Sequence, residues 1–135
     1  MRETRSSAAV RPLRILLVED ERLIRWAVSE TLTSAGHRVL EAPDAATALR
    51  TVGQMSEPFD VVLLDFRLPD SDDLSLVEGI RKKAPSSAIV MMTAYGTPQT
   101  AERAKQLGIF AILPKPFDVG VLEDVIVKAH RAKPN

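Results

Sequence analysis

The sequence feature that most constrains the fold is a short apolar run, residues 61–64, that ends at a single carboxylate, Asp65. A run of this length, rich in branched side chains, is too short for a helix and is typical of a strand buried on both faces. A second run of this kind, residues 13–18, ends at Glu19 and Asp20. In an open parallel sheet, ligands bind beyond the carboxyl ends of the strands, where the strand order reverses. If the two strands are neighbours, the three acids meet there.

Short apolar runs alternate with helical patterns along the whole chain. This alternation, with short connections, predicts an α/β chain whose parallel sheet is covered by helices on both faces. Right-handed crossovers between successive strands restrict the topology further. The expected strands are residues 13–18, 39–40, 61–64, 88–92 and 109–113. The expected helices are residues 21–35, 43–55, 74–84, 97–107 and 121–129.

Several helix ends carry typical start and stop residues. Asp20 is placed to cap the first helix, whose apolar stripe includes Leu23, and Gly36 supplies its C-terminal stop. Thr97 is the expected N-cap of the fourth helix, with Pro98 at the first helical position. Because this fourth helix carries few apolar residues, we expect it to be held weakly and to be able to shift.

Charge and composition exclude several classes of protein. Eighteen basic and eighteen acidic residues give a formal net charge of zero, so no overall field attracts the chain to nucleic acid or to a membrane. The chain has no cysteine, which excludes disulfides, thiol nucleophiles and thiolate metal sites. No apolar run is long enough to span a bilayer, and residues 1–11 lack the apolar block of a signal peptide. We therefore expect one cytoplasmic domain after a flexible leader.

Three carboxylates in one cleft require compensating charge. Two carboxylates about 4 Å apart repel each other by roughly 4 kcal/mol at an effective dielectric constant near 20, so a cation must sit among them or one must stay protonated. Oxygen ligands without a nearby histidine or cysteine favour Mg²⁺ over Zn²⁺. A carboxylate can also attack phosphorus and become an aspartyl phosphate, which needs a cation and a fixed positive side chain.

Thr93 and Lys115 complete the candidate site, because they follow the fourth and fifth strands at the same edge of the sheet. Each residue has an ordinary explanation when considered alone. The acids after the first strand are typical of a helix start, and Asp65 is an acid where a buried strand reaches water. All of them at the ends of separate parallel strands indicate a common site, since the fold brings those ends within reach of one point.

The motifs together resemble the receiver domain of a two-component response regulator over residues 12–131. They are Leu16-Leu17-Val18-Glu19-Asp20-Glu21, Leu64-Asp65 with Leu68-Pro69-Asp70, Met92-Thr93-Ala94, and Lys115-Pro116-Phe117. The resemblance implies a flavodoxin-like, doubly wound (βα)5 fold with a five-stranded parallel sheet in the order 2-1-3-4-5. Residues 132–135 would then be a C-terminal tail or the start of a linker.

The resemblance also implies roles for the acidic residues. Asp65 would accept a phosphoryl group from the phosphohistidine of a sensor histidine kinase, in a Mg²⁺-dependent reaction. The domain would later lose the phosphoryl group by self-dephosphorylation, and it would not be an enzyme in the ordinary sense. Asp20 would ligate Mg²⁺ directly, Glu19 would do so through water, and Arg67 would do so through its backbone carbonyl.

By the same resemblance, Lys115 would pair with the phosphoryl oxygens and Thr93 would hydrogen-bond one of them. The peptide bond before Pro116 is expected to be cis. Phosphorylation would switch the face formed by the fourth helix, the fifth strand and the fifth helix. Through this face the domain would form a homodimer or act on an output domain or partner protein.

Two segments, residues 24–26 and 92–97, are similar to receivers of the nitrogen-regulation class. In that class the receiver controls an AAA+ ATPase and a helix-turn-helix domain, so the expected output is transcriptional. The receiver itself would bind neither nucleic acid nor membrane. The chain ends before either output domain could begin, which leaves an excised receiver and a single-domain regulator as alternatives.

Two residues depart from the family pattern. The family has Tyr or Phe three residues before the lysine, as a ring that swings inward with the threonine, and this chain has Ile112. Tyr95 is an alternative source of that ring. The family also has Gly at the position of Asp73, where a positive φ is tolerated, and Asp is among the few residues that tolerate such a backbone.

Three other functions compete with the phosphoacceptor. A haloacid-dehalogenase-type phosphatase needs a second Asp two residues after the nucleophile, and that residue here is Arg67. A flavodoxin must cradle the FMN phosphate with its first loop, and the acids at residues 19–21 would repel it. A degenerate or stand-alone receiver that serves only as a protein-docking module is the strongest rival, favoured by Ile112 and disfavoured by the intact acids, Thr93 and Lys115.

Overall fold

The computed structural model describes residues 12–71, 74–94 and 97–132. The strands are β1 (Arg14–Val18), β2 (Arg38–Ala42), β3 (Val61–Asp65), β4 (Ala88–Thr93) and β5 (Ala111–Pro114). All neighbouring strands pair in parallel, in one sheet of order β2-β1-β3-β4-β5. This order confirms the doubly wound arrangement that the resemblance implied.

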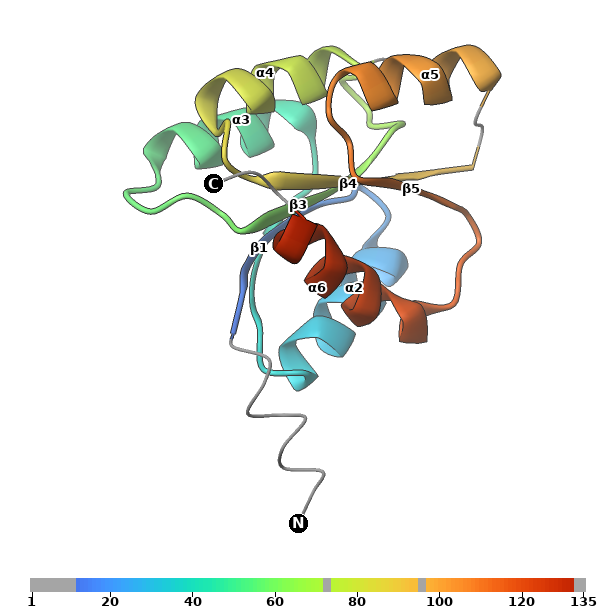
Figure 1. Ribbon diagram of the computed structural model, residues 1–135. Coiled ribbons are helices and arrows are strands. Elements are labelled where there is room, and N and C mark those ends of the chain that lie inside the picture. Colours follow the sequence, from blue (N-terminus) through green and yellow to red (C-terminus); the bar gives the residue numbers. More distant parts are fainter. Residues whose placement is uncertain (1–11, 72–73, 95–96, 133–135) are drawn as a thin grey trace.

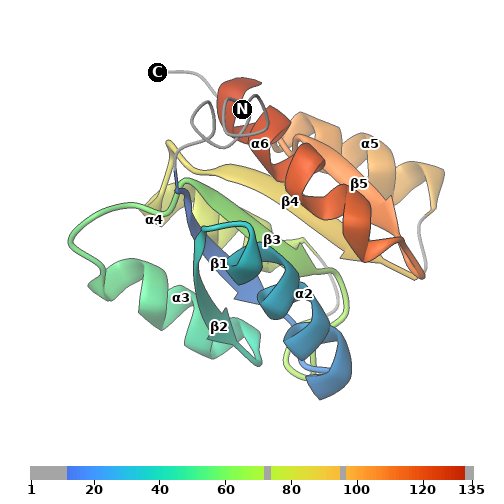
Figure 2. The same cartoon turned by 90° about the horizontal axis from the view of Figure 1, so that it is seen from below.

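Five helices and one 3₁₀ turn connect and follow the strands. They are α2 (Arg22–Ser34), α3 (Ala45–Gln54), α4 (Ser75–Lys83), α5 (Pro98–Gln106), the 3₁₀ turn η1 (Val119–Val121) and α6 (Leu122–Ala132). Helices α3, α4 and α5 cover one face of the sheet (Figure 1), and α2 and α6 cover the other, where they lie in front of the strands in Figure 2. Because each connecting helix returns the chain to the same end of the sheet, all carboxyl ends meet at one edge.

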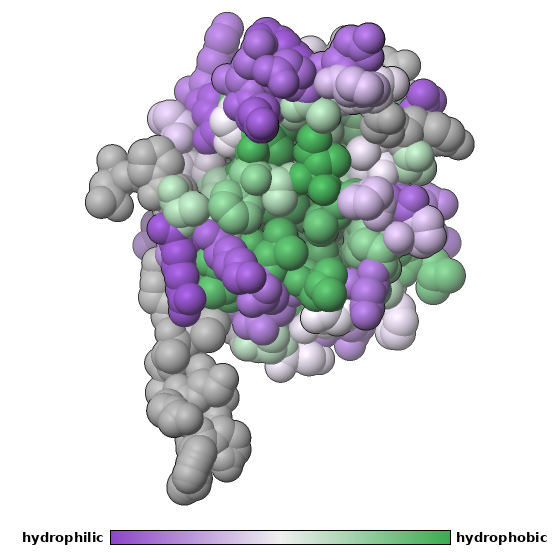
Figure 3. Space-filling view, turned by 45° about the vertical axis from the view of Figure 1, so that its right-hand side comes forward, coloured by the Kyte–Doolittle hydropathy of each residue, from purple (hydrophilic) through white to green (hydrophobic). Residues whose placement is uncertain are grey.

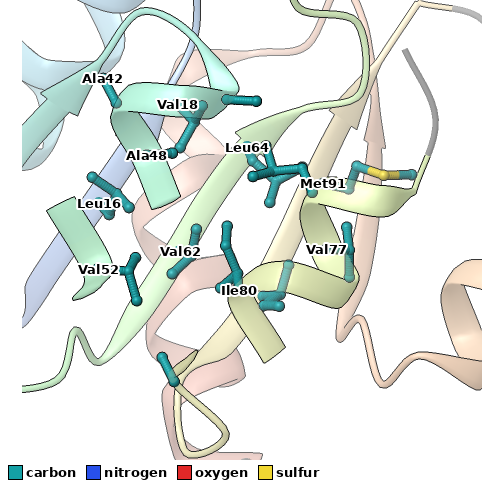
Figure 4. Close-up of a cluster of buried hydrophobic side chains, with 14 of the residues drawn as sticks. Leu16, Val18, Ala42, Ala48, Val52, Val62, Leu64, Val77, Ile80 and Met91 are labelled. Carbon is teal, nitrogen blue, oxygen red and sulfur yellow. The ribbon is translucent and has the colours of Figure 1, made fainter. Parts of the chain in front are cut away.

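Two hydrophobic cores, one on each face of the sheet, hold the strands in place. Leu16 and Val62 belong to the core under α3 and α4, whereas their neighbours Ile15 and Leu63 belong to the core under α2 and α6. Every residue of β3 is buried, which confirms a strand buried on both faces. Figure 4 shows side chains of the first core, among them Leu16, Val18, Ala42, Ala48, Val52, Val62, Leu64, Val77, Ile80 and Met91.

The start of α2 differs from the expectation. Asp20 does not cap this helix, because Glu21 occupies the N-cap position and makes no side-chain capping bond. Leu23 is not part of the buried stripe and is 76% exposed, while Val28 and Leu32 are fully buried. Gly36 ends the helix with a φ of +98°, as expected of a glycine stop. Arg22 and Leu23, the first residues of α2, are therefore exposed to solvent.

The fifth strand begins later than predicted. The N–H of Ile109 donates to the carbonyl of Ala104, which closes the end of α5, and the N–H of Phe110 donates to the carbonyl of Ile89 in β4. The residue-by-residue pairing with β4 runs from Ala111. Val121 is exposed in η1 and does not join the stripe expected for the last helix, whose buried residues start at Leu122.

Other features of the helix ends follow the expectation. Thr97 is the N-cap of α5 and accepts the N–H of Thr100 at 3.1 Å.

No helix in the described ranges is long and apolar enough to cross a membrane. The expectations for the leader at residues 1–11, for Asp73 and for Tyr95, and most of the expected tail, lie outside the described residues.

Candidate functional site

Two neighbouring strands end at the candidate site. Val18 of β1 pairs with Leu64 of β3, so the residues that follow this pair, Glu19 and Asp65, lie beside each other. Carboxylate oxygens of Glu19, Asp20 and Asp65 all lie within 4.8 Å of one another. The convergence predicted from the sequence is therefore confirmed. Glu19 and Asp65 are buried, whereas Asp20 is exposed at the mouth of the cluster.

The ammonium group of Lys115 lies between the two buried carboxylates. Its Nζ is 2.9 Å from Oε1 of Glu19 and 3.0 Å from Oδ2 of Asp65, with Oε1 of Glu21 farther out at 3.9 Å. The side chains of Lys115, Glu19 and Asp65 are only 13%, 0% and 7% exposed. Opposite charges interact more strongly in such surroundings than in water. The chain itself therefore supplies part of the compensating charge that the carboxylates require.

Burial and hydrogen bonding raise the pKa values of both Glu19 and Lys115. Burial raises the pKa of Glu19, although the hydrogen bond from Lys115 and that from the backbone of Glu21 act against the shift. Burial alone would lower the pKa of Lys115, but its hydrogen bonds to Glu19 and Asp65 outweigh that effect and raise its pKa above the ordinary value. Lys115 is therefore a permanent cation at neutral pH.

Backbone groups fix the orientation of both buried carboxylates. Oε2 of Glu19 accepts the N–H of Glu21 at 3.0 Å, and Oδ1 of Asp65 accepts the N–H of Arg67 at 3.2 Å. Each of these carboxylates therefore binds a backbone N–H through one oxygen and the lysine ammonium through the other. This arrangement leaves the exposed Asp20 as the member of the cluster that is most accessible to water.

The ends of β4 and β5 deliver Thr93 and Lys115 to the same edge. Thr93 is buried, with 3% of its surface exposed, and its carbonyl accepts the N–H of Lys115 at 2.8 Å. The Lys115–Pro116 peptide bond is cis, as the resemblance implied. The carboxyl ends of β1, β3, β4 and β5, which were expected to form the site, therefore lie together.

A pocket of about 360 Å³ opens over the carboxylates. The carboxylate cluster offers oxygen ligands alone, with one member exposed, and this donor set fits Mg²⁺, which keeps several waters and takes one or two carboxylates. Ala94 has a small side chain that narrows the entrance little. The lining residues are Asp20, Glu21, Asp65, Arg67, Ala94 and Lys115.

An apolar groove of about 390 Å³ adjoins this pocket, between α2 and the segment that follows β5. Glu21, Ala94 and Lys115 line both the groove and the pocket. The exposed Leu23 lines the groove, which explains why this residue fits an apolar pattern without being part of the core. The other groove residues are Ile24, Ala27, Val28, Pro116, Phe117 and Val119.

Two side chains outside the predicted site hold its loops. Arg25 of α2 donates from Nη1 to the carbonyls of Glu19 at 2.8 Å and Asp20 at 3.4 Å, and from Nε to Oε1 of Glu41 at 3.1 Å. Asp70 accepts two backbone N–H groups at the start of α3. The sequence did not indicate these contacts, because residue spacing does not show which distant backbone groups a side chain reaches.

Comparison with known proteins identifies relatives along most of the chain. The family model for the "Response regulator receiver domain" matches residues 15–127. The DNA-binding transcriptional regulator NtrC of Azospirillum brasilense is 36% identical over 115 residues, which are 85% of this chain and 24% of that protein. The response regulator protein PilR of Pseudomonas aeruginosa is 36% identical over 118 residues, 87% of this chain and 26% of that protein. The chain thus spans about a quarter of the length of these relatives.

Solved structures give the same match in three dimensions. The non-phosphorylated receiver domain of HemR from Leptospira biflexa superposes with a TM-score of 0.82 at 30% identity, over 93% of this chain and 98% of that one. NtrX from Brucella abortus, in complex with ADP, superposes with a TM-score of 0.80 at 32% identity, over 90% of this chain and 27% of NtrX.

Proposed function

This chain belongs to the response regulator receiver domain family of two-component signalling, and from that premise we propose that Asp65 is its phosphoacceptor. The surroundings of Asp65 support this assignment. Its Oδ2 lies 3.0 Å from the ammonium of Lys115, and its carboxylate belongs to the cluster with Glu19 and Asp20 under an open pocket. Phosphoryl transfer depends on such a fixed positive side chain and on oxygen ligands for a divalent cation.

The proposed phosphodonor is the phosphohistidine of a sensor histidine kinase. A carboxylate oxygen of Asp65 attacks phosphorus, and the new P–O bond forms as the P–N bond to the imidazole breaks. The electron pair of the broken bond returns to the imidazole nitrogen, so the donor is left as free histidine. Water later attacks the phosphorus and releases inorganic phosphate, which restores the carboxylate. The chain thus acts as a switch with a limited lifetime.

The neighbouring residues have separate proposed roles. Mg²⁺, when bound, would neutralise charge on the phosphoryl oxygens. Asp20, which is exposed, would be a direct ligand along with Asp65 itself, and Arg67 would contribute its backbone carbonyl. Glu19 would act through water, as the resemblance to the family implies. Lys115 would bind a phosphoryl oxygen with its ammonium, and the hydroxyl of Thr93 would donate to another.

The apolar groove beside the pocket is the proposed docking surface for the donor. It shares Glu21, Ala94 and Lys115 with the pocket, so a helix that lies in the groove brings its side chains directly to Asp65. The exposed Leu23 offers an apolar side chain that is removed from water on docking. Burial of apolar surface contributes about 25 cal/mol per Å² to the stability of the complex. We therefore assign this groove to the kinase domain that carries the phosphohistidine.

Helix α5 is the proposed output element. Ala104 is its one buried residue, and its N-cap Thr97 follows closely after Thr93. A shift of Thr93 toward the phosphoryl group would move this connection and the helix with it. Shifting the equilibrium between two positions of such a helix from 1:99 to 99:1 takes about 5.5 kcal/mol of differential interaction. One charge-assisted hydrogen bond supplies roughly 1.5–3 kcal/mol. Ile112 adds no ring that could contribute, so we expect a partial shift.

The face formed by α5, β5 and α6 would carry the signal. Apolar residues gather in the middle of the side of the molecule that Figure 3 shows, with hydrophilic residues around them. Such a patch fits a homodimer contact or the surface of an output domain. NtrC is named as a DNA-binding transcriptional regulator, and we propose that this receiver controls transcription through an output domain or partner, in the cytoplasm and without binding nucleic acid or membrane itself.

Acetyl phosphate with Mg²⁺, followed by intact-mass measurement, tests this function. We expect wild type to gain the mass of one phosphoryl group only when Mg²⁺ is present, and Asp65→Asn to gain none. A receiver that serves only as a protein-docking module, the alternative favoured by Ile112, would remain unmodified under the same conditions. Absence of the mass gain in a folded wild-type protein would therefore contradict the proposal.

A further inference from the structure

Asp70 follows the phosphoacceptor in the loop between β3 and α4, yet it bonds to a different element. Its Oδ1 accepts the N–H of Ala45 at 2.8 Å, and its Oδ2 accepts the N–H of Ala46 at 3.0 Å. These are the first two residues of α3, whose N–H groups have no partner within the helix. The carboxylate therefore ties the loop after Asp65 to the N-terminus of α3.

Helix α3 also has an N-cap of its own. Oδ1 of Asp44 accepts the N–H of Thr47 at 2.7 Å, which is the usual arrangement at a helix start. The two aspartates thus satisfy different N–H groups at one helix end. Asp44 belongs to the helix start, whereas Asp70 belongs to the loop, so of these two aspartates only Asp70 joins the loop to the helix.

The turn that carries Asp70 is closed by its own backbone. Leu68 is buried and pairs with Ser71 through two backbone hydrogen bonds, of 2.8 Å and 3.2 Å. Asp70 sits in this narrow turn, so its bonds to α3 hold the whole turn against the helix. Arg67 lies between the turn and Asp65, and its N–H donates to Oδ1 of Asp65.

We propose that Asp70 is a positioning residue for the phosphoryl site, which fixes the Arg67 peptide by anchoring the turn of residues 68–71 to α3. The inference rests on the proposed function of Asp65. The N–H of this peptide orients the phosphoacceptor, and its carbonyl is the proposed cation ligand. Removing a group that holds a metal ligand in place typically weakens metal affinity by about 10- to 100-fold.

Asp44 provides a matched control for Asp70. Asp44→Ala and Asp70→Ala each remove one negative charge from the same helix end, and each leaves N–H groups of α3 without their acceptor. An effect of charge or of helix stability appears in both variants. An effect of loop position appears only in Asp70→Ala. Asp70→Asn, which keeps one acceptor oxygen, should lie between wild type and Asp70→Ala.

Mg²⁺ titration followed by backbone amide NMR shifts tests the inference, together with amide hydrogen exchange at Arg67 and Leu68 without Mg²⁺. For Asp70→Ala we expect about tenfold weaker Mg²⁺ binding and faster exchange at both amides. For Asp44→Ala we expect lower thermal stability with the wild-type Mg²⁺ affinity. Should Asp70→Ala not fold, Asp70→Asn carries the same comparison with Asp44→Asn.

Equal losses of Mg²⁺ affinity in the two alanine variants, or wild-type affinity in Asp70→Ala, would overturn the positioning role. Asp20→Asn, titrated in parallel, separates this result from failure of the proposed function. If wild type shows no Mg²⁺ response, or if Asp20→Asn responds as wild type does, the cation site itself is wrong, and the role of Asp70 falls with it.

Discussion

Replacing Lys115 with methionine should destabilise the domain, because methionine keeps an unbranched side chain but removes the ammonium. That ammonium lies 2.9 Å from Glu19 and 3.0 Å from Asp65, and both carboxylates are almost fully buried. Breaking a buried ion pair by removing one partner typically costs about 3–5 kcal/mol. We expect about 3 kcal/mol, the lower end of this range, because Glu19 can take up a proton and the pocket admits water.

The loss of stability in Lys115→Met should depend on pH. Burial raises the pKa of Glu19 above 4.5, and removal of the hydrogen bond from Lys115 raises it further. A carboxyl group with a higher pKa in the folded state contributes stability below its unfolded pKa and loses that contribution as the pH rises through its folded pKa. The variant should therefore be nearest to wild type at mildly acidic pH. Its loss of unfolding free energy relative to wild type should grow toward neutral pH. The growth should reach up to about 1.4 kcal/mol per pH unit over the pH range in which unfolding releases one proton.

Urea unfolding between about pH 5 and 8 in the presence of EDTA measures this effect, with fluorescence of the single tryptophan, Trp26, as the signal. Lys105→Met, at an exposed position on α5, is the matched control and should change stability by less than about 0.5 kcal/mol. Mg²⁺ should restore more stability to Lys115→Met than it adds to wild type. A deficit that is small, or that stays constant with pH, would refute the idea that Lys115 neutralises buried carboxylates.

Asp20→Asn should lose the Mg²⁺-dependent amide shifts of wild type, and an unchanged titration would remove Asp20 from the cation site. Thr93→Ala should still accept a phosphoryl group, but beryllofluoride should shift the amides of α5 less than in wild type; equal shifts would show that another group moves the helix. Gly36→Ala should lower the free energy of unfolding by about 1–2 kcal/mol. The cost comes from the backbone alone, because φ is +98° there and no atom lies within 4 Å of an added Cβ. Urea unfolding measures the change, and wild-type stability would contradict the backbone argument.

Much of the fold could be predicted from the sequence because strand burial and strand ends leave a direct pattern. The apolar run before Asp65 marks a strand buried on both faces, and β3 is such a strand. The rule that ligands meet beyond the carboxyl ends of parallel strands then placed Glu19, Asp20 and Asp65 together, as their positions confirm.

Details that depend on tertiary contacts could not be predicted in this way. Leu23 fits the apolar stripe of α2, but it lines a groove beside the site and is exposed. Asp20 fits a helix cap, yet it lies in the acidic cluster and makes no capping bond. Local patterns mislead most where residues serve a site instead of the core. The bonds of Asp70 to α3 leave no local pattern, since they join segments far apart in the sequence.

Chemical location of the phosphoryl group tests whether Asp65 is the phosphoacceptor. Borohydride reduces an aspartyl phosphate to homoserine, so peptide mapping by mass spectrometry after treatment with acetyl phosphate and Mg²⁺ identifies the modified residue. We predict homoserine at Asp65, none at Glu19 or Asp20, and none anywhere when Mg²⁺ is replaced by EDTA. Reduction at Asp20, or a modified residue outside the acidic cluster, would contradict the assignment of Asp65 as the phosphoacceptor.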